Sequence, residues 1–124
     1  MNTVTDPTVI AYLHNNCQEK RKGISMHLVS SYPDRIPVIV GRGELKLTPP
    51  LQQHKFLPSA DATFGKFCLE VRKRILNVEP HISIFFFVNN FVPPHSISMK
   101  HIYEKYSSED GFLYVTYACE NTFG

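Results

Sequence analysis

The pattern of apolar and polar residues along the 124-residue chain changes between helical and strand spacing, and it predicts three helices. Around the polar run at residues 19–22, apolar residues recur every three to four positions and predict one amphipathic helix of about 14 residues with a basic outer face. A second helix of about 13 residues is predicted from Phe64, with the Thr63 hydroxyl capping its first turn. A short third helix is predicted at residues 99–106. The apolar positions of the first helix are Leu13, Cys17, Ile24 and Leu28.

Between the helices, runs of β-branched and aromatic residues predict four strands. Residues 35–40 are nearly all apolar, which is typical of a strand covered on both faces. A short strand at residues 54–57 ends before Pro58, and a proline there marks a sheet edge. Residues 83–88 predict a buried strand followed by a turn at two asparagines, and residues 112–117 predict the last strand.

The resulting order is a helical arm followed by β, β, α, β, α, β. This order predicts an α+β fold, a ubiquitin-like β-grasp with an N-terminal helical extension. Residues 1–31 are expected to form the arm, packed on the core, and residues 32–124 the ubiquitin-like domain with a flexible tail at residues 118–124. A chain of this length is expected to fold as one domain.

Composition narrows the classes of function. With 43% hydrophobic and 19% charged residues, the sequence is typical of a globular protein, and a net charge of +2 is too small to indicate nucleic-acid binding. The longest apolar run, residues 82–88, is too short to span a membrane, so any membrane association is expected to be acquired. No cofactor or metal is predicted, because the six histidines lack ligand spacing.

The cysteines and the last residue each leave alternatives open. Cys17, Cys68 and Cys119 are far apart, which favours reduced thiols over a disulfide framework. An enzyme is the weaker class, with a small cysteine hydrolase as the form it would take. Gly124 has no side chain beside its carboxylate, so it suits activation in a narrow enzyme channel, but a chain end that simply frays fits as well.

Six segments of the chain together resemble the autophagy-related ubiquitin-like modifiers, the family that includes the GABA-receptor-associated protein. The resemblance extends over about residues 19–124, in order and with nearly the family spacing. The segments are Tyr32-Pro33-Asp34-Arg35-Ile36-Pro37-Val38-Ile39-Val40, Lys55-Phe56-Leu57, Val71-Arg72-Lys73-Arg74-Ile75, Phe85-Phe86-Phe87-Val88-Asn89-Asn90 with Pro93-Pro94, Glu109-Asp110-Gly111-Phe112-Leu113-Tyr114-Val115, and Glu120-Asn121-Thr122-Phe123-Gly124.

For this family the resemblance implies a β-grasp with two N-terminal helices. It also implies a conjugation pathway in which the protein is the substrate and not the enzyme. An E1-like enzyme would activate Gly124, an E2-like enzyme would carry it as a thioester, and the product would be an amide with phosphatidylethanolamine. A cysteine protease would process or delipidate the protein. The expected location is the cytoplasm, and the autophagosome membrane once lipid is attached, because two acyl chains give stable anchoring. Since the sequence ends at Gly124, a processed form or a protein made without a tail is expected.

The resemblance also implies capture of short aromatic-x-x-aliphatic motifs in cargo receptors by strand addition at residues 54–57. Arg35 and Arg74 would pair with acidic residues flanking the motif. The first pocket, for the aromatic residue, would consist of Leu28, Pro37, Lys55, Leu57 and Phe112. The alternative for these five residues is that they are ordinary core and rim residues. The alternative for the whole protein is a peptide-binding trafficking adaptor that uses the same groove and never receives lipid.

The second pocket, for the aliphatic residue, departs from the family pattern. Pro58, Ser59, Ala62 and Glu70 stand where the family usually has Val, Pro, Leu and Leu. Losing two leucine-sized walls removes at most ~2 to 4 kcal/mol of apolar contact and would shift selectivity toward ligands with a basic residue near Glu70. The predicted second pocket is Phe56, Pro58, Ala62, Phe67 and Glu70. Basic runs at residues 20–22 and 72–74 are either solvated helix faces or surfaces that steer acidic partners.

Overall fold

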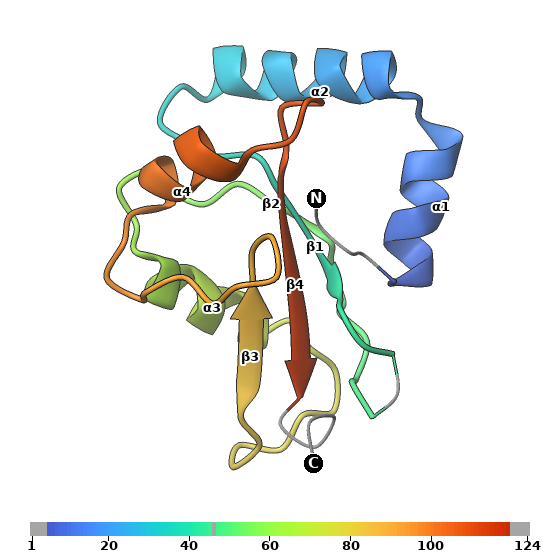
Figure 1. Ribbon diagram of the computed structural model, residues 1–124, viewed down its shortest axis with the longest axis vertical. Helices are drawn as coiled ribbons and strands as arrows, with labels where there is room; N and C mark the ends of the chain where they lie inside the picture. Colours follow the sequence, from blue (N-terminus) through green and yellow to red (C-terminus); the bar gives the residue numbers. More distant parts are fainter. Residues whose placement is uncertain (1–4, 46, 120–124) are drawn as a thin grey trace.

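A computed structural model describes residues 5–45 and 47–119 and shows the predicted α+β class (Figure 1). Its helices and strands follow the predicted order, with one more helix in the arm. The helices are α1 (Pro7–Asn15), α2 (Gln18–Ser31), α3 (Phe64–Arg72) and α4 (Met99–Tyr106). The strands are β1 (Val38–Arg42), β2 (Lys55–Phe56), β3 (Ile84–Phe87) and β4 (Leu113–Cys119).

The strands form a four-stranded mixed sheet in the order β2-β1-β4-β3. The two central strands, β1 and β4, run parallel, with Val38 opposite Leu113 and Arg42 opposite Tyr117. The outer strands are antiparallel to their neighbours. Strand β2 therefore lies at an edge, as its terminal proline predicted, and its outer side is where a further strand could add.

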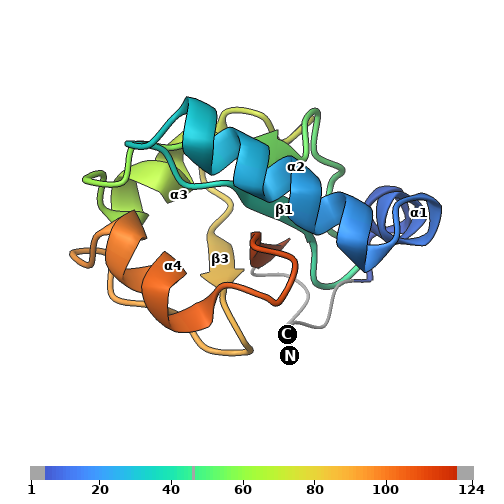
Figure 2. The same cartoon turned by 90° about the horizontal axis from the view of Figure 1, so that it is seen from above.

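Each face of the sheet is covered by a different pair of helices. In Figure 1, α3 and α4 lie to the left of the strands and α1 lies to the right. In the view from above in Figure 2, α2 crosses over the strands. Alternation along β4 sends Leu113, Val115 and Tyr117 into the larger core with α3 and α4. Tyr114, together with Phe112 just before the strand, joins a smaller cluster under the arm. Two buried faces explain why β1 and β4 are mostly apolar.

The single helix predicted from the apolar spacing is wrong, because the chain breaks into α1 and α2 at Asn16 and Cys17, whose backbones are extended. The two N-terminal helices implied by the family resemblance are confirmed. Helix α1 begins at Pro7, after Asp6, whose carboxylate accepts the Thr8 amide at 3.0 Å. The break is held by a contact across space: the Arg21 guanidinium donates to main-chain carbonyls at the end of α1. Apolar spacing continues through the break, so the periodicity alone did not reveal it.

Several predicted boundaries also shift. Strand β1 begins at Val38 instead of residue 35, because Pro37 has no amide donor for the ladder. Strand β4 continues through Ala118 and Cys119, which pair with β3, so these two residues belong to the sheet and not to the predicted tail at 118–124. Helix α3 has 9 residues and ends at Arg72 in a turn. Strand β3, predicted to be buried, lies at the second edge and is only partly covered.

Two local predictions are confirmed. The Thr63 hydroxyl accepts the Lys66 amide at 3.2 Å and caps α3. Asn89 and Asn90 form the turn after β3 with φ angles of 49° and 68°, the left-handed region that asparagine tolerates. Both features depend on neighbours in the sequence, which explains why they could be predicted.

Candidate functional site

A groove of about 310 Å³ lies between the end of β2 and helix α3. It contains all five residues predicted for the second peptide pocket, and Arg35, Leu57, Ser59 and Lys66 complete its lining. The five are Phe56, Pro58, Ala62, Phe67 and Glu70. The fold therefore brings these residues together, while their role in peptide binding stays a prediction.

The base of the groove is aromatic and its rim is charged. The rings of Phe56 and Phe67 meet edge to face, with centroids 5.8 Å apart, and Phe67 is buried in the larger core. On the rim, the Glu70 carboxylate lies 3.3 Å from the Lys73 ammonium, and both side chains are more than half exposed. An exposed pair of this kind contributes little, so Glu70 is able to exchange Lys73 for a cation on a ligand.

The outer edge of β2 presents main-chain groups to solvent. The His54 and Pro58 carbonyls accept amides from residues 40 and 36, so alternate residues of this segment face the neighbouring strand. Lys55 and Leu57 consequently face outward. Their carbonyls accept side-chain hydrogen bonds from Gln53 Nε2 at 2.9 Å and Arg35 Nη1 at 3.1 Å, respectively. These donors belong to exposed groups, so the amides of an added peptide strand can replace them.

The residues predicted for the first pocket are divided between two places. Leu28 packs against the small cluster under the arm, to which Phe112 belongs, and Lys55 lies opposite Ile39 of the same cluster. Pro37 is buried, and its carbonyl accepts the Leu113 amide at 3.0 Å. Leu57, in contrast, lines the groove of the second pocket.

The two arginines predicted as charge contacts also differ in position. Arg35 lines the groove and bonds the Leu57 carbonyl. Arg74 is exposed in the turn after α3, where its main chain bonds Gln52 and Val71, and it does not line the groove. Arg35 is therefore placed to contact a peptide in the groove, and Arg74 only one that extends beyond it.

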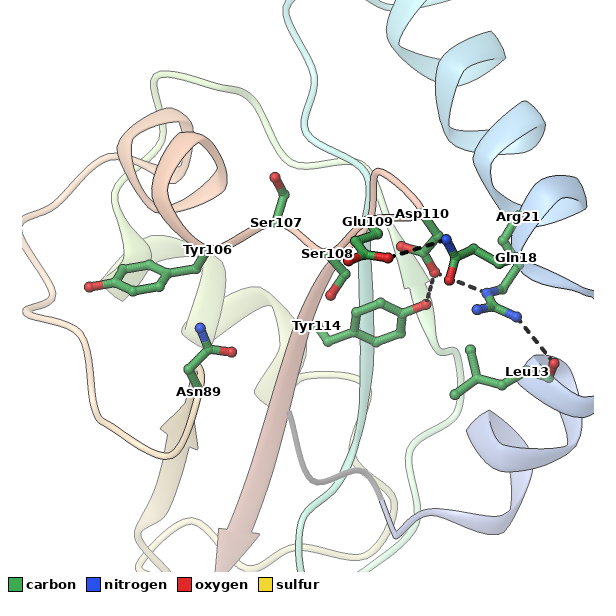
Figure 3. A pocket seen from close by; sticks show the side chains of 10 residues that line it. All are labelled: Leu13, Gln18, Arg21, Asn89, Tyr106, Ser107, Ser108, Glu109, Asp110 and Tyr114. Atoms are coloured by element: carbon green, nitrogen blue, oxygen red, sulfur yellow. Dashed lines mark hydrogen bonds and ion pairs between the residues drawn. The ribbon is translucent and has the colours of Figure 1, made fainter. Parts of the chain in front are cut away.

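A larger pocket of about 570 Å³ lies between the arm and the start of β4, and the sequence did not indicate it (Figure 3). At its inner end, Asp110 accepts the Arg21 Nε at 3.0 Å, the Phe112 amide at 3.0 Å and the Tyr114 hydroxyl. The Ser25 hydroxyl donates to the Asp110 carbonyl at 2.6 Å. The lining residues are Leu13, Gln18, Arg21, Asn89, Tyr106, Ser107, Ser108, Glu109, Asp110 and Tyr114.

The charged side chains of Arg21 and Asp110 form an ion pair in this pocket and join the arm to the ubiquitin-like core. Burial alone would lower the pKa of Arg21, but its hydrogen bond to Asp110 raises the pKa above the ordinary value. Burial and the hydrogen bond to Asp110 raise the pKa of the Tyr114 hydroxyl. Gly111 has φ +84°, and a Cβ there would lie 2.2 Å from the Ser25 oxygen, so only glycine permits this close approach. We interpret the pocket as a structural joint.

The joint corrects one prediction about charge. Residues 20–22 were expected to form a basic outer face, but Arg21 is turned inward, with only 15% of its side chain exposed. Lys20 and Lys22 are exposed on α2. A signal was present in the Asp110-Gly111 pair just before the last strand, but its partner on α2 is 89 residues away and could not be identified from spacing.

The cysteines and the remaining site classes can be placed as well. Burial raises the pKa of the Cys68 thiol to about 12 and also raises that of Cys119, so both are protonated near neutral pH. Cys17 is exposed.

Within residues 5–45 and 47–119, no group of three or more His, Cys, Asp or Glu side chains is arranged to hold a metal ion. Over the same ranges, no helix has the length and apolar character needed to cross a membrane. Gly124 lies outside the described residues.

Comparison with known proteins gives the same assignment from sequence and from structure. The family model described as "Autophagy protein Atg8 ubiquitin like" matches residues 20–124. Autophagy-related protein 8 of Dictyostelium discoideum is 42% identical over 116 residues, which are 94% of this chain and 95% of the relative. Autophagy-related protein 8d of Arabidopsis thaliana is 45% identical over 116 residues, covering 94% of this chain and 96% of the relative.

Solved structures agree with these sequence matches. Trypanosoma brucei ATG8 superposes with a TM-score of 0.80 at 35% identity, over 88% of this chain and 93% of the other. Plasmodium falciparum Atg8, solved in complex with a Plasmodium falciparum Atg3 peptide, superposes with a TM-score of 0.77 at 31% identity, over 85% of this chain and 92% of the other. The chain therefore belongs to the Atg8 family of autophagy ubiquitin-like proteins.

Proposed function

We propose that this protein is joined through Gly124 to phosphatidylethanolamine and so becomes a membrane-attached modifier in autophagosome formation. The observation that carries the proposal is the family match, which runs from residue 20 to Gly124 itself. A soluble domain gains stable membrane attachment when two acyl chains are added, whereas a single chain is marginal. The protein is thus expected in the cytoplasm before conjugation and on autophagosome membranes after it.

In this pathway the protein acts as substrate, and the enzymes are supplied by others. An E1-like enzyme, an E2-like enzyme and a processing or delipidating cysteine protease are its expected partners. The raised pKa values of the two buried thiols argue against a cysteine nucleophile in the core. No cofactor is required of this chain in the proposed reaction, since the chemistry at the glycine carboxylate belongs to its enzymes.

We further propose that the edge of β2 captures extended peptides from cargo receptors and conjugation enzymes. The outward main-chain groups of Lys55 and Leu57 would pair with the peptide backbone, and the adjacent groove would take its fourth residue. The Plasmodium relative solved with an Atg3 peptide supports peptide capture. With Glu70 on the rim, the preferred fourth residue is aliphatic or carries a basic end.

Lipid conjugation is tested with purified protein, its cognate activating and conjugating enzymes, ATP and phosphatidylethanolamine liposomes. Mass spectrometry should show the mass of one lipid added at Gly124, and Gly124→Ala should remain unmodified. Enzymes that modify a reference Atg8 but leave this protein unchanged would reject the conjugation. Peptide capture without lipid addition would instead favour the trafficking adaptor that never receives lipid.

A further inference from the structure

Helix α1 places an aromatic ring against the lysine of the predicted first peptide pocket. The Lys55 ammonium lies 4.2 Å from the centroid of the Tyr12 ring. This is a cation–π contact, which requires the ring face to be directed toward the ammonium. Tyr12 belongs to α1 and Lys55 to β2, so the contact joins the arm to the edge strand.

The same ring packs against the buried cluster that contains Phe112, another member of the predicted pocket. Tyr12 and Leu28 both lie against the cluster that contains Phe112 and Ile39. Because Lys55 pairs with Ile39, its side chain lies on the face of the sheet that carries this cluster. An aromatic peptide residue paired with Lys55 would direct its ring to the same face. Tyr12 therefore has the chemistry and the place expected for the aromatic residue of a bound peptide.

One feature of this contact makes it replaceable. The Tyr12 hydroxyl is buried and has no hydrogen-bond partner among the described residues. A buried hydroxyl without a partner is unfavourable, so it lowers the stability of the conformation in which the Tyr12 ring is packed against the cluster. The ends of α1 are held independently, by Asp6 on Arg42 at 3.0 Å and by the Asn16 carbonyl on Arg21. The ring can therefore move outward while the arm keeps its anchors.

We propose that Tyr12 occupies the first pocket of the free protein and competes with the aromatic residue of an incoming peptide. This inference rests on the proposed capture of peptides at β2. The apparent affinity for a peptide is lowered by the fraction of molecules in which Tyr12 is in place. Selectivity follows too, since only a ligand whose aromatic residue packs better than Tyr12 displaces it.

The opposite arrangement would make Tyr12 a fixed wall that contacts the bound peptide. The two arrangements predict opposite signs for its removal. Tyr12→Ala opens an occupied pocket and tightens binding, whereas the loss of a wall weakens it. Tyr12→Phe keeps the ring and removes only the unsatisfied hydroxyl, so it should close the pocket at least as well as tyrosine.

The experiment is calorimetric titration with a synthetic Trp-x-x-Leu peptide, compared with the same peptide carrying Ala in place of Trp. Tyr12→Ala should bind the Trp peptide roughly threefold to tenfold more tightly than the unaltered protein, and Tyr12→Phe no more tightly than it. Ile10→Ala is the matched control, because Ile10 lies on α1 and is 47% exposed. It should leave the affinity unchanged. The peptide with Ala in place of Trp should not bind Tyr12→Ala more tightly than it binds the unaltered protein.

A second measurement reports the ring position without depending on affinity. Proton NMR should show the Lys55 ε-methylene shifted upfield by the Tyr12 ring in the free protein and released from it when the Trp peptide binds. Equal or weaker binding by Tyr12→Ala overturns the inference while peptide capture stands. Absence of binding by all the variants overturns peptide capture and the inference together.

Discussion

Removing the charge of Asp110 should weaken the attachment of the arm to the core and lower the stability of the protein. The side chains of Arg21 and Asp110 are 15% and 4% exposed, and the pair is joined at 3.0 Å. In Asp110→Asn the shape is kept, but the amide cannot accept from Arg21, Phe112 and Tyr114 as the carboxylate does. Breaking a buried pair by removing one partner costs about 3 to 5 kcal/mol. We expect about 3 kcal/mol here, because Arg21 keeps its carbonyl partners on the arm.

The assay is urea unfolding monitored by circular dichroism. The loss of unfolding free energy is calculated from the shift of the urea midpoint, provided that the m-value is unchanged. Glu109→Gln is the matched control, since Glu109 lines the same pocket but is exposed, and its carboxylate accepts the Gln18 amide at 3.4 Å. It should change stability by less than about 0.5 kcal/mol. Combining Asp110→Asn with Arg21→Met should cost less than the sum of the single changes. A loss under about 1 kcal/mol for Asp110→Asn, or full additivity, would refute the role of the joint.

Three further outcomes are expected. Glu70→Leu restores an aliphatic wall worth up to about 2 kcal/mol and should tighten calorimetric binding of a Trp-x-x-Leu peptide, whereas unchanged affinity would contradict the groove assignment. Iodoacetamide at pH 7.5 should alkylate Cys17 and spare Cys68 and Cys119 in peptide maps of the folded protein, and equal labelling of all three would contradict their burial. Burial alone would raise the pKa of Asp6, but hydrogen bonds from Arg42 and the Thr8 amide lower this pKa below 3.8. The stability that the Asp6 carboxylate contributes is therefore complete above about pH 4, and it is lost as the pH falls through the lowered pKa of the folded protein. As the pH is lowered, the urea midpoint should therefore fall more for the unaltered protein than for Asp6→Asn. An equal fall of the midpoint in both proteins would contradict this.

The parts of the fold that could be predicted are those determined by residues close in sequence. The Thr63 cap depends on a hydroxyl three residues from its amide, and the second groove depends on β2 and α3, which are neighbours along the chain. Helical periodicity could not place the break after α1, since Leu13 and Cys17 satisfy one continuous helix equally well. That break is fixed by Arg21, which lies one helix further on.

The parts that could not be predicted depend on contacts between distant segments. Spacing alone does not pair Arg21 with a particular acid, because the chain has 11 Asp and Glu residues and only the fold brings Asp110 to it. The contact of Tyr12 with Lys55 is of the same kind, since it joins α1 to β2, which are far apart in the sequence. The family resemblance predicted five residues that line the groove between β2 and α3, but not the contact of Tyr12 with Lys55.

The central strand separates the two proposed activities in space. Strand β4 has seven residues and spans roughly 23 Å at about 3.3 Å per residue. Phe112 precedes its first residue and belongs to the cluster where a peptide would bind, whereas Cys119 at its far end leads toward the predicted conjugation glycine. Hydrogen bonding to β1 on one side and β3 on the other keeps the two ends apart. A peptide in the proposed first pocket would therefore bind at the opposite end of β4 from Cys119. From the proposed function we expect that one molecule holds cargo while it is attached to a membrane.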